Sequence, residues 1–165
     1  MSEGAWAGTA EQMELAIRGY FDACNSGVAE AVAAYFTADA THYFPPGMYA
    51  GPFVGARSIG ERWALAVQNF GSRWSVDSFI GDPASGRAVI EWTHRKRTDG
   101  VVLRGDEWYV FDRPTGLICE IRAYYASPQA EGLTRLSCKV FRTPRGAIRW
   151  TDRGVAAVLL GRPPR

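Results

Sequence analysis

The chain has 165 residues, of which 47% are hydrophobic and 22% are charged, and these values are typical of a single globular domain. They exclude a wholly disordered, collagen-like or disulfide-scaffold protein, and no apolar run approaches the roughly 18 residues that a membrane span needs. The net charge of +2 is unevenly distributed, because residues 1–135 carry a net charge of −4 and residues 136–165 a net charge of +6, so the larger part is not expected to bind nucleic acid.

Two helices are predicted near the start of the chain. Thr9 and Gln12 form a capping-box pattern, and apolar side chains then recur at helical spacing as far as Cys24. Gly27 is suited to the left-handed residue that ends such a helix. A second, short helix is predicted within residues 28–36.

A strand and a third helix are predicted next. Residues 40–44 have the pattern of a strand, which the sequence Pro-Pro-Gly closes. The segment 48–57 is too rich in glycine and proline to form a regular element. Ser58 and Glu61 form a second capping box, which predicts that a helix begins there and continues to Phe70.

The hydrophobic period changes to two after residue 73. Four runs are predicted as strands, separated by short turn sequences: 73–80, 87–97, 101–112 and 117–126. Such short connections favour antiparallel pairing of sequential strands. Helices followed by a meander of strands predict an α+β fold, in which a curled antiparallel or mixed sheet forms a cone around the three N-terminal helices.

The two ends of the chain are predicted to lie outside this domain. Residues 10–130 form the predicted domain, residues 1–9 an N-terminal extension, and residues 131–165 an arginine-rich, poorly packed appendage. The alternative for the appendage is a basic arm for nucleic acid or anionic lipid. The N-terminus has no secretory pattern and the three cysteines are not closely spaced, so we expect a cytoplasmic protein with no metal cluster and no membrane partner.

Several segments within residues 10–128 resemble one family. These segments are Tyr20–Gly27, Tyr35–Thr41, Phe53–Ile59, Tyr109–Asp112 and Leu117–Tyr125. They resemble the nuclear-transport-factor-like superfamily, which includes ketosteroid isomerases, SnoaL-like polyketide cyclases, scytalone dehydratase and limonene-epoxide hydrolase. The resemblance implies a cystatin-like α+β barrel, and it implies a homodimer formed through the outer face of the sheet. The superfamily supports many chemistries, so the activity has to be argued from the pocket.

The resemblance to ketosteroid isomerases implies two site residues. Their oxyanion-binding tyrosine stands seven residues before the glycine that ends the first helix, and this spacing gives Tyr20. Their second acid stands five residues before an aspartate that here is Asp112, and this spacing gives Glu107. Asp106 remains an alternative, because neighbouring residues of a strand face opposite ways. Glu107 could act as a neutral hydrogen-bond donor or as a charged partner of a histidine.

The proton-shuttling aspartate of that family has no counterpart here. Phe44 stands at its position before Pro45, and Ala123 stands where limonene-epoxide hydrolase has its aspartate. A neutral imidazole is a suitable acid or base near pH 7, so His42 and His94 are the candidates to replace the missing base.

Three further residues are predicted to line the pocket with Phe44 and Ala123, or else to pack the core. Trp63 belongs to the third helix, Trp92 shares a strand face with His94, and Tyr109 shares a face with Glu107. The resulting prediction is a pocket for a small apolar molecule, and a cofactor-independent enzyme of cyclase, dehydratase or isomerase type that acts on a carbonyl-containing or polycyclic substrate. The alternative is a non-catalytic ligand-binding or assembly module on the same fold.

Overall fold

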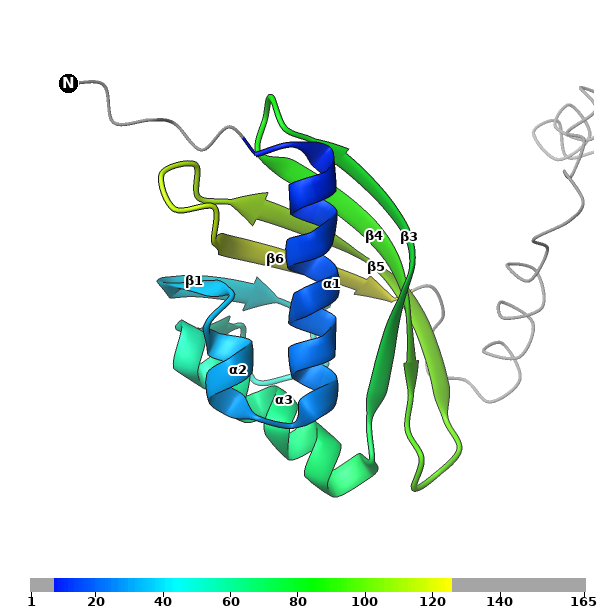
Figure 1. Ribbon diagram of the computed structural model, residues 1–165. Helices are drawn as coiled ribbons and strands as arrows, with labels where there is room; N and C mark the ends of the chain where they lie inside the picture. The colour runs from blue at the N-terminus through cyan, green and yellow to red at the C-terminus, as the bar shows by residue number, and fades with distance from the viewer. Residues whose placement is uncertain (1–7, 126–165) are drawn as a thin grey trace, which may run out of the picture.

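The computed structural model describes residues 8–125 (Figure 1). Three helices and six strands follow one another along the chain: α1 Ala10–Ser26, α2 Ala29–Ala33, β1 Phe36–Tyr43, β2 Phe53–Val54, α3 Ala56–Phe70, β3 Arg73–Asp82, β4 Arg87–Arg95, β5 Val102–Phe111 and β6 Ile118–Tyr125. None of the helices in this part of the chain has the length and apolar character needed to cross a membrane. The predicted appendage at residues 131–165 lies outside the described residues, as do the limits of the predicted domain near residue 130.

Helix α1 has the ends that its sequence predicts. The Thr9 hydroxyl accepts a hydrogen bond from the Gln12 backbone N–H at 3.2 Å, and the Gln12 side chain accepts one from the Thr9 backbone N–H at 2.9 Å. Gly27 ends the helix at φ 72°, a conformation that glycine adopts without a steric penalty. The apolar stripe of α1 is buried and includes Tyr20 and Cys24.

Two predicted boundaries in the first half are wrong. Phe36 is the first residue of β1 rather than the end of a helix, because it pairs in parallel with Ile118 of the last strand. Helix α3 begins at Ala56 with Gly55 as its N-cap, so Ser58 lies inside the first turn and does not cap the helix. The segment predicted to be irregular contains the two-residue strand β2, which pairs with β1.

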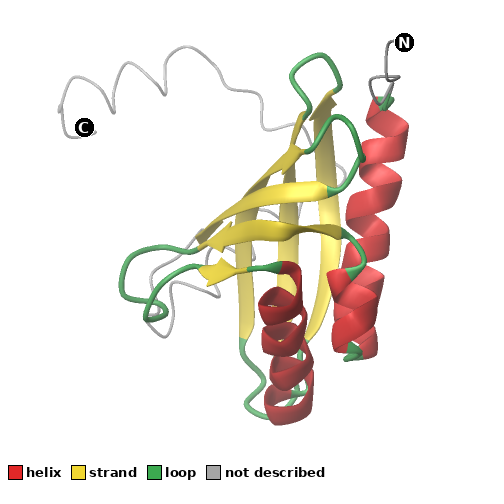
Figure 2. Ribbon diagram, turned by 90° about the vertical axis from the view of Figure 1, so that its left-hand side faces the viewer, coloured by secondary structure: helices red, strands yellow, loops and turns green. Residues whose placement is uncertain are grey.

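The six strands form one curled sheet that does not close. Its order is β2-β1-β6-β5-β4-β3, and the four strands from β3 to β6 pair antiparallel in sequence order, as predicted. Strand β1 pairs in parallel with β6, which makes the sheet mixed. Helix α1 runs along one side of the sheet (Figures 1 and 2). Strands β2 and β3 are the two edges of the sheet. The α+β fold is therefore confirmed.

The two faces of the sheet differ in character. Glu107 is buried and pairs across the inner face with Ala123 of β6, whereas Asp106 is exposed on the outer face. The inner face packs against the helices and forms the core. On the outer face, Asp77 contacts Arg104 at 3.2 Å and accepts a hydrogen bond from Thr93 at 2.5 Å.

Candidate functional site

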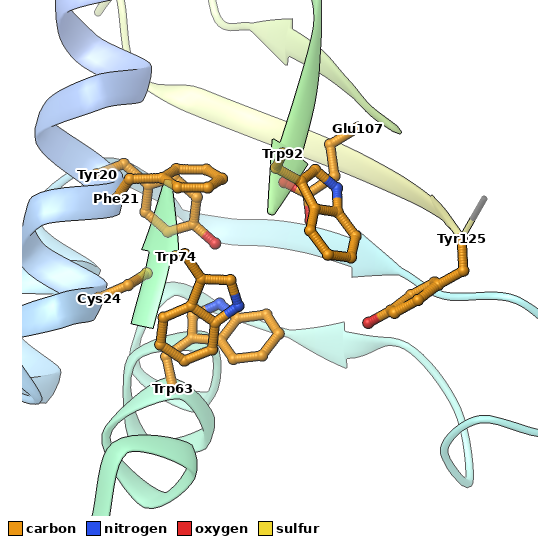
Figure 3. Close-up of a pocket in the computed structure, with 8 residues that line it drawn as sticks. All are labelled: Tyr20, Phe21, Cys24, Trp63, Trp74, Trp92, Glu107 and Tyr125. Carbon is orange, nitrogen blue, oxygen red and sulfur yellow. The ribbon is translucent and has the colours of Figure 1, made fainter. Parts of the chain in front are cut away.

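A small cavity lies between helices α1 and α3 and the inner face of the sheet. Its volume is about 20 Å³, which is room for roughly one water molecule. Eight side chains line it (Figure 3): Tyr20, Phe21, Cys24, Trp63, Trp74, Trp92, Glu107 and Tyr125. Six of them are buried, and Trp74 and Tyr125 are partly exposed. A ring-sized ligand therefore requires lining side chains to move, and these two are the freest to do so.

Tyr20 brings a protonated hydroxyl group to the cavity. It lies on the buried stripe of α1 and is 2% exposed. Burial raises the pKa of Tyr20 well above its ordinary value, and the charge of Glu107 adds to the rise. The Trp63 indole offsets part of this rise in pKa, although its N–H does not reach hydrogen-bond geometry with any group in the described part of the chain. The Tyr20 and Tyr125 hydroxyls point toward each other from opposite sides of the cavity (Figure 3).

Glu107 is the acidic side chain of the cavity, and both of its oxygen atoms have buried neighbours. Tyr109, two residues along β5 on the same face, donates a hydrogen bond of 2.5 Å to Oε2. The Nε2 atom of His42 lies 3.6 Å from Oε1, which is within ion-pair range but beyond hydrogen-bond length. Burial, together with the charge of Glu107, raises the pKa of Tyr109 well above its ordinary value, so Tyr109 remains a donor.

His42 lies behind Glu107 rather than on the cavity wall. It is fully buried, and its ring stacks on Phe44 with centroids 4.2 Å apart and meets Trp63 edge to face at 5.5 Å. Neither ring nitrogen has a hydrogen-bond partner among residues 8–125. The position of Phe44 therefore explains the orientation of His42: the phenyl ring holds the imidazole flat, beside the carboxylate.

His94 lies in a different environment. Its Nε2 atom is 2.8 Å from the hydroxyl of buried Ser72, and its ring stacks on Trp74 with centroids 4.5 Å apart. Burial lowers the pKa of His94 to about 4, with Lys96 contributing, so the ring is neutral near pH 7. Trp74 lines the cavity but His94 does not, so the structure does not bring the two histidines together at one site.

The other predicted pocket residues divide into two groups. Trp63 and Trp92 line the cavity, and each carries a buried indole N–H without a hydrogen-bond partner in the described part of the chain. Tyr109 and Ala123 lie beside Glu107 and do not line the cavity, and Phe44 packs behind the wall against His42 and Trp63.

Four lining residues were not predicted: Phe21, Cys24, Trp74 and Tyr125. The sequence contains a signal for each of them. Cys24 stands four residues after Tyr20 and Phe21 stands four residues after Ile17, and this spacing places both on the buried stripe of the helix. Tyr125 shares strand parity with Ile121 and Ala123, so its inward direction could have been predicted. Trp74 required knowledge of how β3 pairs with β4, where it stands opposite His94.

The chemistry available to this cavity is that of a carboxylate and neutral donors. Within residues 8–125 no group of three or more His, Cys, Asp or Glu side chains is arranged to hold a metal ion. A buried carboxylate can accept a proton, and a phenol opposite it can donate a hydrogen bond to an oxygen atom that gains negative charge. The arrangement is therefore suited to proton transfer at a carbon atom beside a carbonyl group.

The comparisons with known proteins agree with the fold. The model of the SnoaL-like domain family matches residues 17–121. A protein of unknown function with a cystatin-like fold from Methylobium petroleophilum PM1 is 45% identical, with a TM-score of 0.71, and the match covers 84% of this chain and 97% of that chain. No curated protein sequence matches the chain significantly.

Two more distant solved structures share the fold. Bal32a, from a soil-derived mobile gene cassette, is 18% identical with a TM-score of 0.62, over 72% of this chain and 92% of its own. SalBIII, an epoxide hydrolase/cyclase-like enzyme with a role in pyran ring formation in the polyether salinomycin, is 13% identical with a TM-score of 0.57, over 70% of this chain and 92% of its own. The predicted resemblance over residues 10–128 is thus confirmed at the level of family and fold.

Proposed function

The chain belongs to the SnoaL-like family, and on this premise we propose that it is a cofactor-independent acid–base enzyme that moves a proton at a carbon atom beside a carbonyl group. The observation that supports this proposal is the position of Glu107. Its carboxylate is 7% exposed, lines the cavity with the Tyr20 hydroxyl, and is oriented from behind by Tyr109 and His42. The substrate is a small and mostly apolar carbonyl compound, because aromatic rings form most of the wall.

Glu107 is the proton acceptor in this proposal, and His42 is a positioning residue. The expectation from the sequence was the reverse, with a histidine as base and Glu107 holding an oxygen atom. The geometry favours the exchange of roles because Glu107 lines the cavity and His42 does not. The Tyr109 hydroxyl occupies Oε2, whereas the His42 imidazole stays 3.6 Å from Oε1, beyond hydrogen-bond length, so Oε1 is the atom that takes the proton.

Tyr20 stabilises the oxygen atom on which charge develops. When Glu107 removes a proton from the carbon beside the carbonyl group, the C–H bond breaks and its electron pair forms the enolate. The negative charge moves to the former carbonyl oxygen, which accepts a hydrogen bond from the Tyr20 hydroxyl. Because the pKa of Tyr20 is raised by burial, the hydroxyl keeps its proton and donates throughout this step.

The fate of the enolate determines the reaction type. Return of the proton from Glu107 to a second carbon gives isomerisation. Loss of a neighbouring hydroxyl group, which takes up that proton and leaves as water, gives dehydration. Attack on a second carbonyl carbon of the same molecule, whose oxygen atom takes up that proton, gives cyclisation. SalBIII, which has the same fold, is described as cyclase-like, with a role in the formation of a pyran ring. That description supports a ring-forming reaction as one member of this class.

The experiment that tests the proposed function is exchange of α-hydrogens for deuterium. Cyclohexanone is incubated in D₂O with the protein, and loss of the α-proton signal is followed by ¹H NMR. The proposal predicts exchange that is proportional to protein concentration and exceeds the rate in buffer. An exchange rate equal to that of buffer, measured with protein that binds the ketone, would contradict it.

Non-catalytic ligand capture is the second candidate function. Two observations favour it: Phe44 occupies the position of the base of the related isomerases, and the cavity of about 20 Å³ is nearly filled by rings. A capture protein would bind the ketone and leave its α-hydrogens unexchanged. The same NMR sample therefore separates the two functions.

A further inference from the structure

We infer that the cavity selects an uncharged ligand with at least two acceptor oxygen atoms. One of these oxygen atoms takes part in the reaction, and the other accepts hydrogen bonds from the indole N–H groups of Trp63 and Trp92. This inference rests on the proposed function, since it specifies the substrate of the same cavity: a dicarbonyl compound, or a ketone that carries an ether oxygen. The reacting carbonyl oxygen accepts its hydrogen bond from Tyr20, and the second oxygen atom accepts from the indoles.

The two indole groups are buried donors without acceptors. Trp63 is 8% exposed and Trp92 is 2% exposed, and the Nε1 atom of each is inaccessible and has no hydrogen-bond partner among residues 8–125. Both side chains line the cavity, one from α3 and the other from β4. Buried polar groups in proteins almost always have a partner, so two orphaned donors at one cavity indicate an acceptor that comes from outside the chain.

The rings are held in place by their surroundings. Trp92 meets Tyr125 edge to face at 5.1 Å, and its ring lies against Gly105, where an added Cβ atom would come within 2.5 Å of the indole. Trp63 packs edge to face on Trp74 at 5.4 Å and on His42 at 5.5 Å. The missing partners are therefore not a consequence of loosely packed side chains, since each ring makes close aromatic contacts.

An indole N–H only donates, so its partner must be an acceptor. Glu107 is the carboxylate of the wall, but Oε2 already accepts a hydrogen bond from Tyr109, and the proposed function leaves Oε1 for the substrate proton. The Tyr20 and Tyr125 hydroxyls can both donate and accept, but neither is in hydrogen-bond geometry with an indole N–H group. The two indole N–H groups thus remain unpaired among the described residues, and a ligand rich in acceptor oxygen atoms complements them.

The charge of the wall excludes an anionic ligand. Among residues 8–125 no lysine or arginine lines the cavity, whereas the carboxylate of Glu107 does. A carboxylate or phosphate group would lose its hydration and face this negative charge without a cation, which is strongly unfavourable. Neutral carbonyl and ether oxygen atoms accept hydrogen bonds without that penalty.

The experiment uses three small probes of similar shape: cyclohexane-1,4-dione with two acceptors, cyclohexanone with one, and 4-oxocyclohexane-1-carboxylate with a negative charge. Indole ¹⁵N-labelled protein is titrated with each probe, and the Trp63 and Trp92 signals are assigned with Trp63→Phe and Trp92→Phe. We expect the dione to bind most tightly and the carboxylate most weakly. The indole proton signal of at least one of the two tryptophans should move downfield with the dione.

The two phenylalanine variants remove the N–H and keep an aromatic ring. We expect at least one of them to lower the affinity for the dione by roughly 3- to 10-fold, which is the effect of one hydrogen bond. Trp108→Phe on the outer face is the matched control and should bind like the unaltered protein. If a variant fails to fold, the wild-type indole signals still decide the question.

Equal affinity for dione and monoketone, or indole signals that do not move, would overturn the inference, because water alone would then satisfy the indoles. Tighter binding of the carboxylate would also overturn it. Failure of the proposed function has a different signature: the dione binds through the indoles, yet the α-hydrogens of bound ketone do not exchange.

Discussion

The Tyr109 hydroxyl donates a hydrogen bond of 2.5 Å to Oε2 of Glu107 inside the cone. The two residues are separated by one position on β5, so both side chains point to the inner face of the sheet. Tyr109 is fully buried, and its hydroxyl fixes the plane of the carboxylate and leaves Oε1 for another partner. A charge-assisted hydrogen bond of this kind helps to hold an ionised carboxylate in a largely apolar pocket.

Replacement of Tyr20 by phenylalanine tests the oxygen-binding role. Removing one donor from an oxyanion site typically lowers the rate by about 10²–10³-fold, and we expect a loss of this size in α-hydrogen exchange. The ring and its packing against Phe36 remain, so the protein should stay folded. Tyr43→Phe, on an exposed strand position, is the control. A Tyr20→Phe rate within twofold of the wild-type rate would remove Tyr20 from the mechanism.

Replacement of His42 by asparagine tests whether the imidazole positions Glu107. We expect a loss of about 10-fold in kcat, with KM little changed, because His42 does not line the cavity. A merely structural role predicts lower stability with an unchanged kcat, and this outcome would contradict positioning.

His94 predicts a pH dependence of folding stability. An unfolded histidine binds a proton below about pH 6.5, whereas folded His94 stays neutral until about pH 4. The unfolded state then binds more protons, so the free energy of unfolding falls as the pH drops through this window. Between pH 7 and pH 5 the loss is of the order of 2 kcal/mol.

Urea denaturation at these two pH values measures the contribution of His94. His94→Gln keeps a polar partner for Ser72 and removes the titration, so its stability should change less between pH 7 and pH 5 than that of the unaltered protein. Identical pH dependence in the two proteins would show that His94 titrates normally in the fold.

The outer face of the sheet is the expected dimer interface. Trp108 is 49% exposed and Tyr124 is 52% exposed, and both border a groove of about 230 Å³ that also contains Arg122 and Glu120. Light scattering should give twice the chain mass, and the double variant Trp108→Lys, Tyr124→Lys should be monomeric with the same helical circular dichroism. A monomeric unaltered protein would contradict this expectation.

Local signals in the sequence were sufficient to predict the elements that depend only on residues close by in the chain. The capping box at Thr9, the glycine at position 27 and the alternating strands after residue 73 correspond to observed features. The early start of β1 could not be predicted in this way, because Phe36 joins the sheet through pairing with Ile118, far along the chain. The capping-box pattern at Ser58 predicted the wrong start because the helix begins earlier, directly after Gly55.

The candidate site shows the same difference between what local sequence signals predict and what depends on contacts between distant parts of the chain. Strand parity and the family spacing placed Glu107 rather than Asp106 on the inner face, and they placed Tyr20 on the buried stripe of α1. Parity also placed His94 inward, but it carries no information on how far along the cone a residue lies. His94 stands opposite Trp74, so it packs behind a ring of the cavity wall instead of lining the cavity.

The most direct test of the proposed mechanism is the rate of α-hydrogen exchange in Glu107→Gln beside that in Asp106→Asn. The two residues are neighbours on β5, but only Glu107 is buried, whereas Asp106 is exposed on the outer face. General bases typically contribute about 10²–10⁴-fold, so Glu107→Gln should lose at least 100-fold while Asp106→Asn keeps the wild-type rate. A folded Glu107→Gln protein that exchanges ketone hydrogens as fast as the unaltered chain would contradict the account.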